Sequence, residues 1–180
     1  FIFFVVAILN GNSLIAGLTI ALAGSLLGVL KYNFQPAQIY LGDTGSMFIG
    51  LILGALAMTG SYSNHNDFGF VAPMLILGVP IFDMLFVMFL RRRKGLSMFL
   101  GSKDHYALRC LKAGFTVKQI VLGSYLATLI LGGLALWLMY TSPLKTGLLL
   151  LGIGLVVLLI ARKLSRIPMP SNQDVFGETR

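Results

Sequence analysis

Charged residues are scarce in this sequence of 180 residues, because only 14 are Lys or Arg and 6 are Asp or Glu. Their share of 11% is less than half of the roughly 25% usual in soluble domains. Lys31 is the only charged residue in the first 42 positions, and Lys145 is the only one from 120 to 160. With 57% apolar residues and a mean hydropathy of +0.87, these uncharged runs exclude a water-soluble or nucleic-acid-binding domain, a coiled coil and a disordered chain. They predict membrane-spanning helices.

Cysteine is almost absent as well, because Cys110 is the only one in the chain. One thiol cannot form an internal disulfide, which excludes a disulfide-rich secreted module, and we expect it to be buried or idle in a reducing compartment. The sequence also lacks a Cys/His spacing of the zinc-binding kind, a Walker-type phosphate loop and an internal repeat. Any chemistry must therefore depend on the few polar residues between the apolar runs.

Five apolar segments are long enough to cross a bilayer core of about 30 Å. They predict an all-α fold, a polytopic integral membrane helix bundle. The loops on one side, with Lys118, hold 13 of the 14 basic residues, so the positive-inside rule places those loops in the cytoplasm. The expected spans are 13–30, 46–62, 69–90, 117–140 and 146–161, and the expected cytoplasmic segments are 31–45, 91–116 and 162–180.

The chain begins at Phe1 in the middle of an apolar run. Residues 1–9 would make a helix of about 14 Å, less than half of the bilayer core, so we interpret them as part of a longer helix. Residues 1–163 are then expected to be the C-terminal part of one transmembrane domain. The remainder, 164–180, is polar and carries Pro and Gly, which predicts a disordered cytoplasmic tail.

Short-range signals refine the helix boundaries. Thr116 and Gln119 have the spacing of a capping box at the start of the fourth full span. Pro73 and Pro80 predict a kink in the third span, because each removes a backbone donor. The outer segment 64–67 is expected to be a turn with solvated polar groups. Four glycines form small-residue faces that either pack helices closely or reflect the frequency of glycine in membrane helices. These glycines are Gly24, Gly28, Gly50 and Gly54.

Three of the six carboxylates lie on or near the expected cytoplasmic side. Asp43, Asp83 and Asp104 share that side with His105 and many basic residues, a combination that suits an anionic substrate and a divalent metal ion. Asp43 has a simpler interpretation as a helix N-cap. Asp83 lies about 12 Å into the membrane if its helix is regular, which makes it a functional candidate. Alternatively, Asp83 is a structural partner for a Lys or Arg side chain or for backbone freed by Pro80.

The run Pro-Ala-Gln-Ile-Tyr-Leu-Gly-Asp-Thr-Gly-Ser at 36–46, preceded by Tyr-Asn-Phe at 32–34, resembles the cytoplasmic motif of the polyprenyl-phosphate N-acetylhexosamine-1-phosphate transferases, glycosyl transferase family 4. Pro-Ile-Phe-Asp at 80–83 continues the resemblance. Residues 103–109 match the family's His-x-His-His-Arg motif in part, because His105 and Arg109 keep the register while Ala and Leu replace the other two His. The resemblance covers about residues 1–160 and is most specific at Gly-Asp-Thr-Gly-Ser.

The resemblance implies an enzyme that transfers a sugar-1-phosphate from UDP-N-acetylhexosamine to polyprenyl phosphate at the cytoplasmic face of a bacterial cell membrane. UMP is released, and the product starts a cell-envelope glycan. Mg2+ is the implied cofactor, with Mn2+ as an alternative ion. Asp43 is implied to bind the metal and His105 to contact the diphosphate, with Asp83 as a further catalytic candidate. The implied substrate-binding residues are Tyr40, Asn33 and Arg109.

Other interpretations stay open at this point. Tyr40 also fits an aromatic residue at the membrane interface, and the basic run 91–94 favours anchoring at an anionic lipid surface. A multi-pass transporter is a competing function, although the polar groups gather at one face and no repeat is visible; a non-catalytic membrane scaffold is another. Membrane lipid is an expected partner, nucleic acid is not, and a homodimer is compatible with the sequence. The family's early paired-Asp motif is not in these residues, so we expect the chain alone to be inactive.

Overall fold

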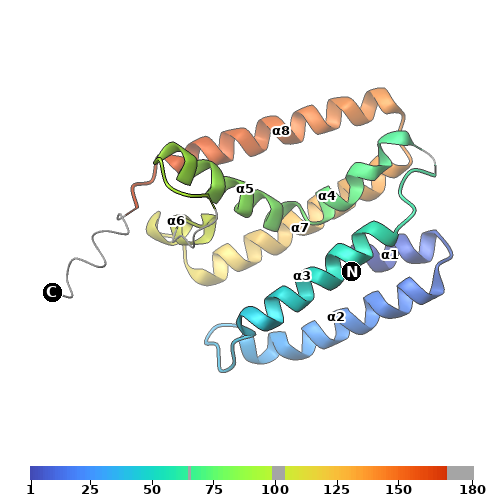
Figure 1. The fold of residues 1–180 in the computed structure, drawn as a ribbon, viewed down its shortest axis with the longest axis horizontal. Helices are drawn as coiled ribbons and strands as arrows, with labels where there is room; N and C mark the ends of the chain where they lie inside the picture. Colours follow the sequence, from blue (N-terminus) through green and yellow to red (C-terminus); the bar gives the residue numbers. More distant parts are fainter. Residues whose placement is uncertain (65, 99–103, 170–180) are drawn as a thin grey trace. The chain divides into compact units, whose positions relative to one another are not determined.

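The computed structural model describes residues 1–64, 66–98 and 104–169, and every regular element in these ranges is helical (Figure 1). This confirms the all-α prediction. The elements in chain order are α1 (Ile2–Leu9), α2 (Ser13–Asn33), α3 (Gly42–Thr59), the 3-10 helix η1 (Asp67–Val71), α4 (Ala72–Ile76), α5 (Gly78–Arg93), α6 (Tyr106–Lys112), α7 (Val117–Met139) and α8 (Pro143–Ser165).

Among the described residues, α2, α3, α7 and α8 are each long and apolar enough to cross a membrane. The chain is therefore a multi-pass membrane protein. The third expected span has the predicted kink, as a break at Leu77 that separates η1 and α4 from α5. Pro80 explains the position of the break: it has no N–H to donate to the carbonyl of Ile76, four residues earlier. The bent pair counts as a fifth span if its two parts cross together.

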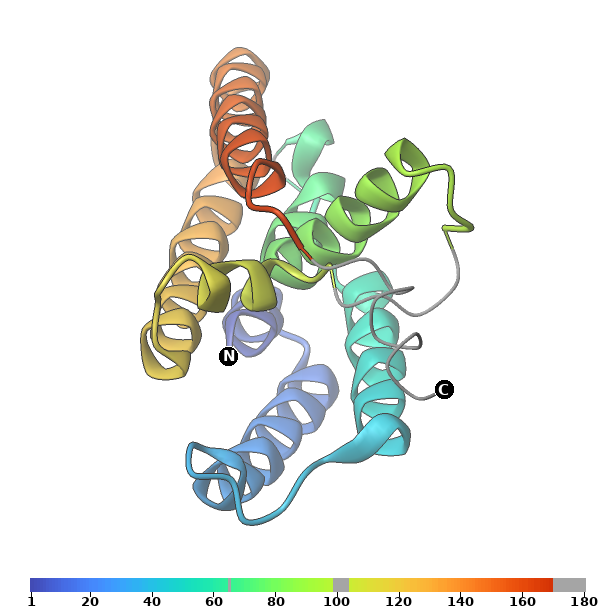
Figure 2. The same ribbon diagram turned by 90° about the vertical axis from the view of Figure 1, so that its left-hand side faces the viewer.

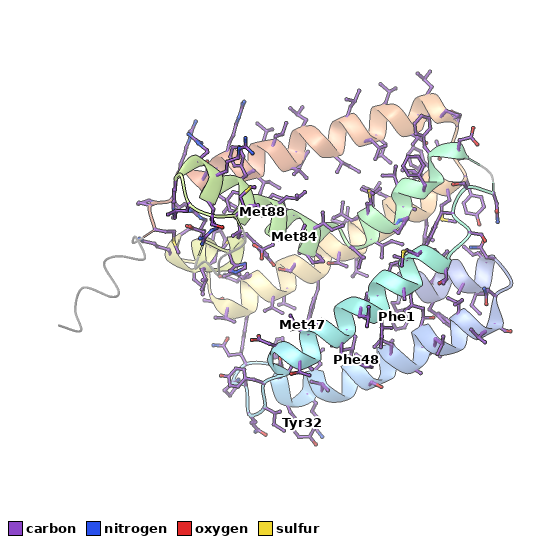
Figure 3. All side chains as sticks on the ribbon, viewed as in Figure 1. Phe1, Tyr32, Met47, Phe48, Met84 and Met88 are labelled. Atoms are coloured by element: carbon purple, nitrogen blue, oxygen red, sulfur yellow. The ribbon has the colours of Figure 1, made fainter. Side chains whose placement is uncertain are left out.

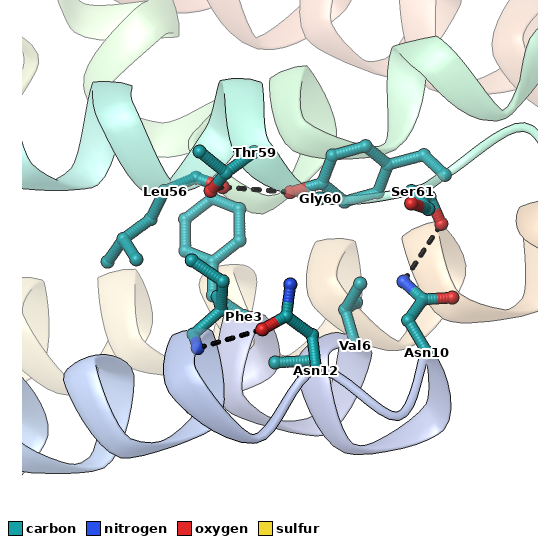
Figure 4. A pocket seen from close by; sticks show the side chains of 11 residues that line it. Phe3, Val6, Asn10, Asn12, Leu56, Thr59, Gly60 and Ser61 are labelled. Carbon is teal, nitrogen blue, oxygen red and sulfur yellow. Dashed lines mark hydrogen bonds between the residues drawn. The ribbon is translucent and has the colours of Figure 1, made fainter.

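Residues 1–78 and 126–146 form one compact unit, in which α1 packs against α2 and α2 contacts α3 (Figure 2). Phe3 and Val6 of α1 and Leu56 of α3 are buried there. They line a small cavity of about 50 Å³, shown in Figure 4, in whose lining Asn10 Nδ2 donates to the carbonyl of Ser61 at 2.9 Å.

Asn66 is buried in the same unit, contrary to the expectation of a solvated turn at 64–67. Its amide nitrogen donates toward the carbonyls of Leu138 (3.0 Å) and Thr141 (2.7 Å) and the hydroxyl of Thr146 (2.8 Å). Its amide oxygen accepts from the N–H of Phe68 at 3.0 Å. This one side chain therefore satisfies polar groups at the turn between α7 and α8, which explains its burial.

Residues 79–125 and 147–169 belong to a second unit. Its buried side chains include Phe86 and Leu90 of α5. The hydroxyls of Tyr106 and Ser124 are 2.7 Å apart and join α6 to α7. Partial burial raises the pKa of the Cys110 thiol above its usual value, so the thiol stays protonated at neutral pH, consistent with the idle role expected for it.

The predicted capping box at the start of α7 is confirmed. The N–H of Thr116 donates to Gln119 Oε1 at 2.8 Å, and the N–H of Gln119 donates to Thr116 Oγ1 at 3.3 Å. At the other end of the chain, α8 continues to Ser165, two residues into the segment expected to be a disordered tail. Residues 170–180 of that segment lie outside the described residues.

Large apolar side chains are exposed on the long helices, among them Met47 and Phe48 on α3, labelled in Figure 3. These two side chains are 75% and 61% exposed. In a bilayer such surfaces contact lipid. The four glycines of the expected small-residue faces have open space where a Cβ would stand, so no helix of the described residues packs closely on them. They are Gly24, Gly28, Gly50 and Gly54.

Candidate active site

Asp83 lies in the second turn of α5 and holds the segment that leads into α6. Its Oδ2 is 2.7 Å from His105 Nδ1, and its Oδ1 accepts the N–H of Tyr106 at 2.9 Å. The second bond satisfies one of the free amides at the start of α6, where His105 is the N-cap residue but makes no side-chain cap. Among the described residues, Asp83 therefore bonds His105 and the N–H of Tyr106, and not a Lys or Arg side chain or backbone freed by Pro80.

The contact with Asp83 determines which nitrogen of His105 is available. When the Asp83 carboxylate is ionised it only accepts hydrogen bonds, and His105 Nδ1 then carries the proton between them. Nε2 is then the free nitrogen, an acceptor in the neutral ring and a donor in the imidazolium. The His105 side chain is 49% exposed, so a ligand can reach this ring.

Asp104, the residue before His105, is held by two ion pairs. Its Oδ2 is 2.7 Å from Lys94 Nζ, and its Oδ1 is 2.7 Å from Arg109 Nη2. Burial alone would raise the pKa of Asp104, but the hydrogen bonds and positive charges of Lys94 and Arg109 outweigh it and lower this pKa below its ordinary value. Asp104 therefore stays ionised and fixes the backbone next to His105.

Arg109 is almost fully buried, and its guanidinium reaches the end of α8. Its Nη1 donates to the carbonyls of Leu164 at 3.0 Å and Ile167 at 2.8 Å. His105 lies just outside α6, which begins at Tyr106, because His105 adopts an extended ψ of 145°. His105 contacts Asp83 of α5, whereas Arg109 contacts Asp104, the end of α8 and the ring of Phe86 in α5. A role of Arg109 in substrate binding stays a prediction.

Sequence reasoning missed the pairing of Asp104 and the burial of Arg91. Arg91 is only 3% exposed, and its Nε donates to the carbonyl of Ser97. The basic run 91–94 is therefore not a uniform surface: Arg92 and Arg93 are exposed, and Lys94 pairs with Asp104. The sequence could have indicated the pairing of Asp104, because a lone Asp within a strongly basic loop favours an ion pair.

The loop 34–41 connects α2 and α3 in the unit of residues 1–78 and 126–146. Hydrogen bonds to backbone carbonyls hold this loop together. The N–H groups of Gln38 and Ile39 both donate to the carbonyl of Tyr32, at 2.8 and 3.2 Å. Asn33 Nδ2 donates to the carbonyl of Ile39 at 3.0 Å. This leaves the side chain of Tyr40, which is 79% exposed, projecting from a tied loop. Asn33 thus supports the segment that carries Tyr40.

Asp43 lies in the first turn of α3, with an exposed carboxylate that has no hydrogen-bond or ion-pair partner among the described residues. The N-cap interpretation of Asp43 is wrong, because the helix begins at Gly42 and Leu41 is the N-cap. Gly42 has a φ of +70°, a left-handed conformation that glycine adopts without strain. The positive end of the helix dipole favours a carboxylate here.

The carboxylate of Asp43 is suited to serve as one ligand of a Mg2+ ion. Mg2+ usually takes one or two carboxylates plus phosphate oxygens and keeps several waters, and Asp43 offers one free carboxylate. No cluster of three or more His, Cys, Asp or Glu side chains occurs within the described ranges. Asp43 alone therefore cannot form a complete cage, and substrate oxygens and water would have to complete the coordination.

Comparisons with known proteins agree on one family. Residues 1–61 match the family described as Glycosyl transferase family 4. Over 122 residues the chain is 38% identical to a Bacillus subtilis (strain 168) protein named probable undecaprenyl-phosphate N-acetylglucosaminyl 1-phosphate transferase, covering 68% of this chain and 34% of the relative. Over 172 residues it is 32% identical to the decaprenyl-phosphate N-acetylglucosaminephosphotransferase of Mycobacterium leprae (strain TN), covering 89% of this chain and 42% of the relative.

A third relative is the undecaprenyl-phosphate alpha-N-acetylglucosaminyl 1-phosphate transferase of Salmonella typhi, 30% identical over 115 residues. That alignment covers 64% of this chain and 30% of the relative. Across the three, the chain spans between 30% and 42% of the length of the curated relatives. No solved structure matches the chain.

Proposed function

Because this chain belongs to glycosyl transferase family 4, we propose that its protein transfers N-acetylhexosamine-1-phosphate from a UDP-sugar to polyprenyl phosphate. An oxygen of polyprenyl phosphate forms a bond to the sugar-bearing phosphorus. The bond from that phosphorus to the bridging oxygen breaks, and UMP leaves with the electron pair. The relatives' names support the acceptor and the N-acetylglucosamine phosphate group; the uridine carrier is our inference.

The observation that carries the proposal is the free carboxylate of Asp43 in Gly-Asp-Thr-Gly-Ser at the mouth of a membrane-spanning helix. Asp43 would hold Mg2+ there, and this ion would neutralise charge that develops on the diphosphate. Phosphoryl transfer asks the protein mainly to position anions and stabilise charge, so one free carboxylate and a set of cations suit the task.

His105 is the second proposed catalytic residue. With Nδ1 held by Asp83, Nε2 is the nitrogen that can serve a phosphate, and the imidazolium form would donate to a phosphoryl oxygen. Asp83 is a positioning residue in this scheme. We assign a positioning role to Arg109 also, supported by its bonds to Asp104 and to the end of α8.

Tyr40 is proposed to present its ring to the uracil, since an exposed aromatic on a closed loop offers a flat apolar face. Asn33 keeps that loop in place through Ile39. We propose that both loops, 34–41 and 94–105, lie in the cytoplasm of a bacterial cell, because 13 of the 14 basic residues fall on that side of the expected topology.

The test is UMP release from UDP-N-acetylhexosamines by the protein expressed from its complete reading frame, with polyprenyl phosphate and Mg2+. We expect Asp43→Asn to reduce turnover at least about a hundredfold, because a metal-stabilised transition state is worth several kcal/mol. Mn2+ binding, measured from the electron paramagnetic resonance signal of the free ion, should weaken in parallel, and this measurement reports the site without turnover. The matched control is Asp67→Asn, another exposed first-turn aspartate, in η1.

Two outcomes would count against the proposal at different levels. Wild-type turnover and Mn2+ binding in Asp43→Asn would remove Asp43 from the metal site. Absence of UMP release by the wild-type protein from every UDP-N-acetylhexosamine would reject the function itself.

A further inference from the structure

A basic cavity of about 370 Å³ lies where the ends of α5 and α8 meet α6, within the unit of residues 79–125 and 147–169. Nitrogen-bearing side chains gather at this end of α5 and α8 in Figure 3. Its volume is within the range of about 300–1,000 Å³ typical of ligand pockets. The lining is partly cationic and partly apolar, and comprises Arg93, Lys94 and Arg109 with Leu90, Ser165, Ile167, Pro168 and Met169.

The cavity has more positive than negative charge. Three cations line it, and the carboxylate paired with them among the described residues is Asp104, which bonds Lys94 and Arg109. Arg93 has no carboxylate partner in the described ranges, and its guanidinium lies 5.8 Å from the ring of Phe89. The Nε of buried Arg109 also lacks an acceptor there. An anion in the cavity would offset this surplus.

We propose that the cavity binds the phosphate group of an anionic phospholipid from the surrounding leaflet. The last turn of α8 adds Arg162 and Lys163 to the same helix end, and α8 is long enough to cross the membrane. Basic pockets at the cytoplasmic ends of transmembrane helices are suited to anionic lipid head groups. The apolar walls fit the glycerol and upper acyl region, which a soluble phosphate would leave unused.

The cavity differs from the proposed reaction site in most of its lining. Arg109, to which we give a positioning role, lines it, but the proposed catalytic residues Asp43 and His105 and the positioning residue Asp83 do not. The inference therefore goes beyond the proposed function and does not depend on it. A bound phospholipid would reduce repulsion between Arg93 and Arg109 and hold the ends of α5 and α8 together, so it should stabilise this unit.

The test is a lipid titration followed by native mass spectrometry, using delipidated protein expressed from its complete reading frame. Phosphatidylglycerol should bind in preference to phosphatidylcholine. Arg93→Gln should weaken phosphatidylglycerol binding about fivefold, the equivalent of about 1 kcal/mol per basic residue near an anionic membrane surface. The control is Arg92→Gln, which removes the same charge from the neighbouring exposed residue that does not line the cavity, and should change binding less than about twofold.

A second variant tests the cavity without changing charge. Ile167→Trp fills the space and should also weaken phosphatidylglycerol binding about fivefold or more. It remains informative if Arg93→Gln does not fold. Unchanged binding in a folded Ile167→Trp protein would overturn the proposal.

Competition identifies the source of the phosphate. Displacement of phosphatidylglycerol by inorganic phosphate would assign the cavity to a soluble anion. Displacement by polyprenyl phosphate at equal concentration would assign it to the acceptor substrate. Equal binding of phosphatidylcholine, or an equal loss of phosphatidylglycerol binding in Arg92→Gln and Arg93→Gln, would show that the lipid is attracted to the basic surface in general and not to the cavity. Each of these results would overturn the proposal, and persistence of the phosphatidylglycerol signal against both competitors supports it.

Discussion

Asp83 Oδ2 and His105 Nδ1 lie 2.7 Å apart, which joins α5 to the segment that opens α6. The same carboxylate accepts the N–H of Tyr106 at 2.9 Å. With one oxygen on the ring and the other on the next backbone amide, Asp83 determines both the position and the tautomer of His105. The orientation of Nε2 therefore depends on a residue 22 positions earlier in the chain.

Asp83→Asn tests this relationship. An amide cannot accept at both positions, so we expect His105 to lose its Nδ1–H tautomer or its orientation. Turnover should fall about 10- to 100-fold, as is usual when the partner of a functional group is lost, with little change in KM. Nitrogen-15 NMR of labelled histidine reports the tautomer independently of turnover. Asp83→Glu, which keeps a carboxylate, should recover part of both signals, and an unchanged tautomer in Asp83→Asn would argue against the positioning role.

We expect His105→Ala to change turnover and Arg109→Lys to change the free energy of unfolding. His105→Ala should reduce turnover at nearly wild-type thermal stability, because its half-exposed ring makes one side-chain contact that is described, with Asp83. Arg109→Lys should lower the free energy of unfolding by roughly 2–3 kcal/mol, because one ammonium cannot replace bonds to Asp104 and two carbonyls. Thermal unfolding with Lys112→Arg as the control measures this; equal stability of Arg109→Lys would show that the buried bonds contribute little.

The pH dependence of stability should include a contribution from Asp104. Its pKa is lower in the folded protein than in the unfolded chain, where an aspartate has a pKa of about 3.9. The stabilisation is then present above the unfolded pKa and is lost as the pH falls through the folded pKa. We expect Asp104→Asn to be less stable than wild type at pH 7, and the difference to narrow below about pH 4. A difference that stays constant to pH 3 would contradict this.

Gly42→Ala should destabilise the protein by about 1–2 kcal/mol, because an L-residue is strained at a φ of +70°. Thermal unfolding measures the change. Gly28→Ala is the matched control, since Gly28 lies inside α2 with open space around its Cβ position and should gain up to about 1 kcal/mol of helix propensity. Losses of equal size in both variants would show that conformation at Gly42 is not the cause.

Membrane orientation can be tested with single cysteines in a Cys110→Ser background. Lys112→Cys and Lys145→Cys both place the thiol at an exposed position, on opposite sides in the expected topology. An impermeant maleimide added to intact cells should label only the cysteine at position 145. Labelling of position 112 alone would invert the topology. Lys103, another residue of the basic loop, lies outside the described residues and is less suitable.

Local sequence patterns predicted the structure where the interacting groups are close in the chain. The capping box joins Thr116 and Gln119, which are three residues apart, so the residue types alone predict their hydrogen bonds. The long spans follow in the same way from uninterrupted apolar runs, because only a helix satisfies its own backbone in lipid. The break at Leu77 was predicted as a kink, and the position of Pro80 accounts for it.

Contacts between distant residues escaped prediction. Arg109 bonds carbonyls 55 and 58 positions away, and the residue types do not reveal that these carbonyls end a helix next to it. The basic run 91–94 has one charge pattern but three environments, because burial depends on which neighbours pack against α5. The carboxylate of Asp83 could have been predicted to have a partner, but not that His105, shifted out of α6, would be that partner.

The buried amide of Asn66 bears on the order in which the protein is assembled. One of its acceptors, the hydroxyl of Thr146, is 80 residues further along the chain. During synthesis, η1 and α4 leave the ribosome well before the α7–α8 turn exists, so the polar groups of Asn66 must stay hydrated or find temporary partners until that hairpin has inserted. Stop codons placed before the α7–α8 turn should therefore leave this segment open to proteases, and those placed after α8 should leave it protected.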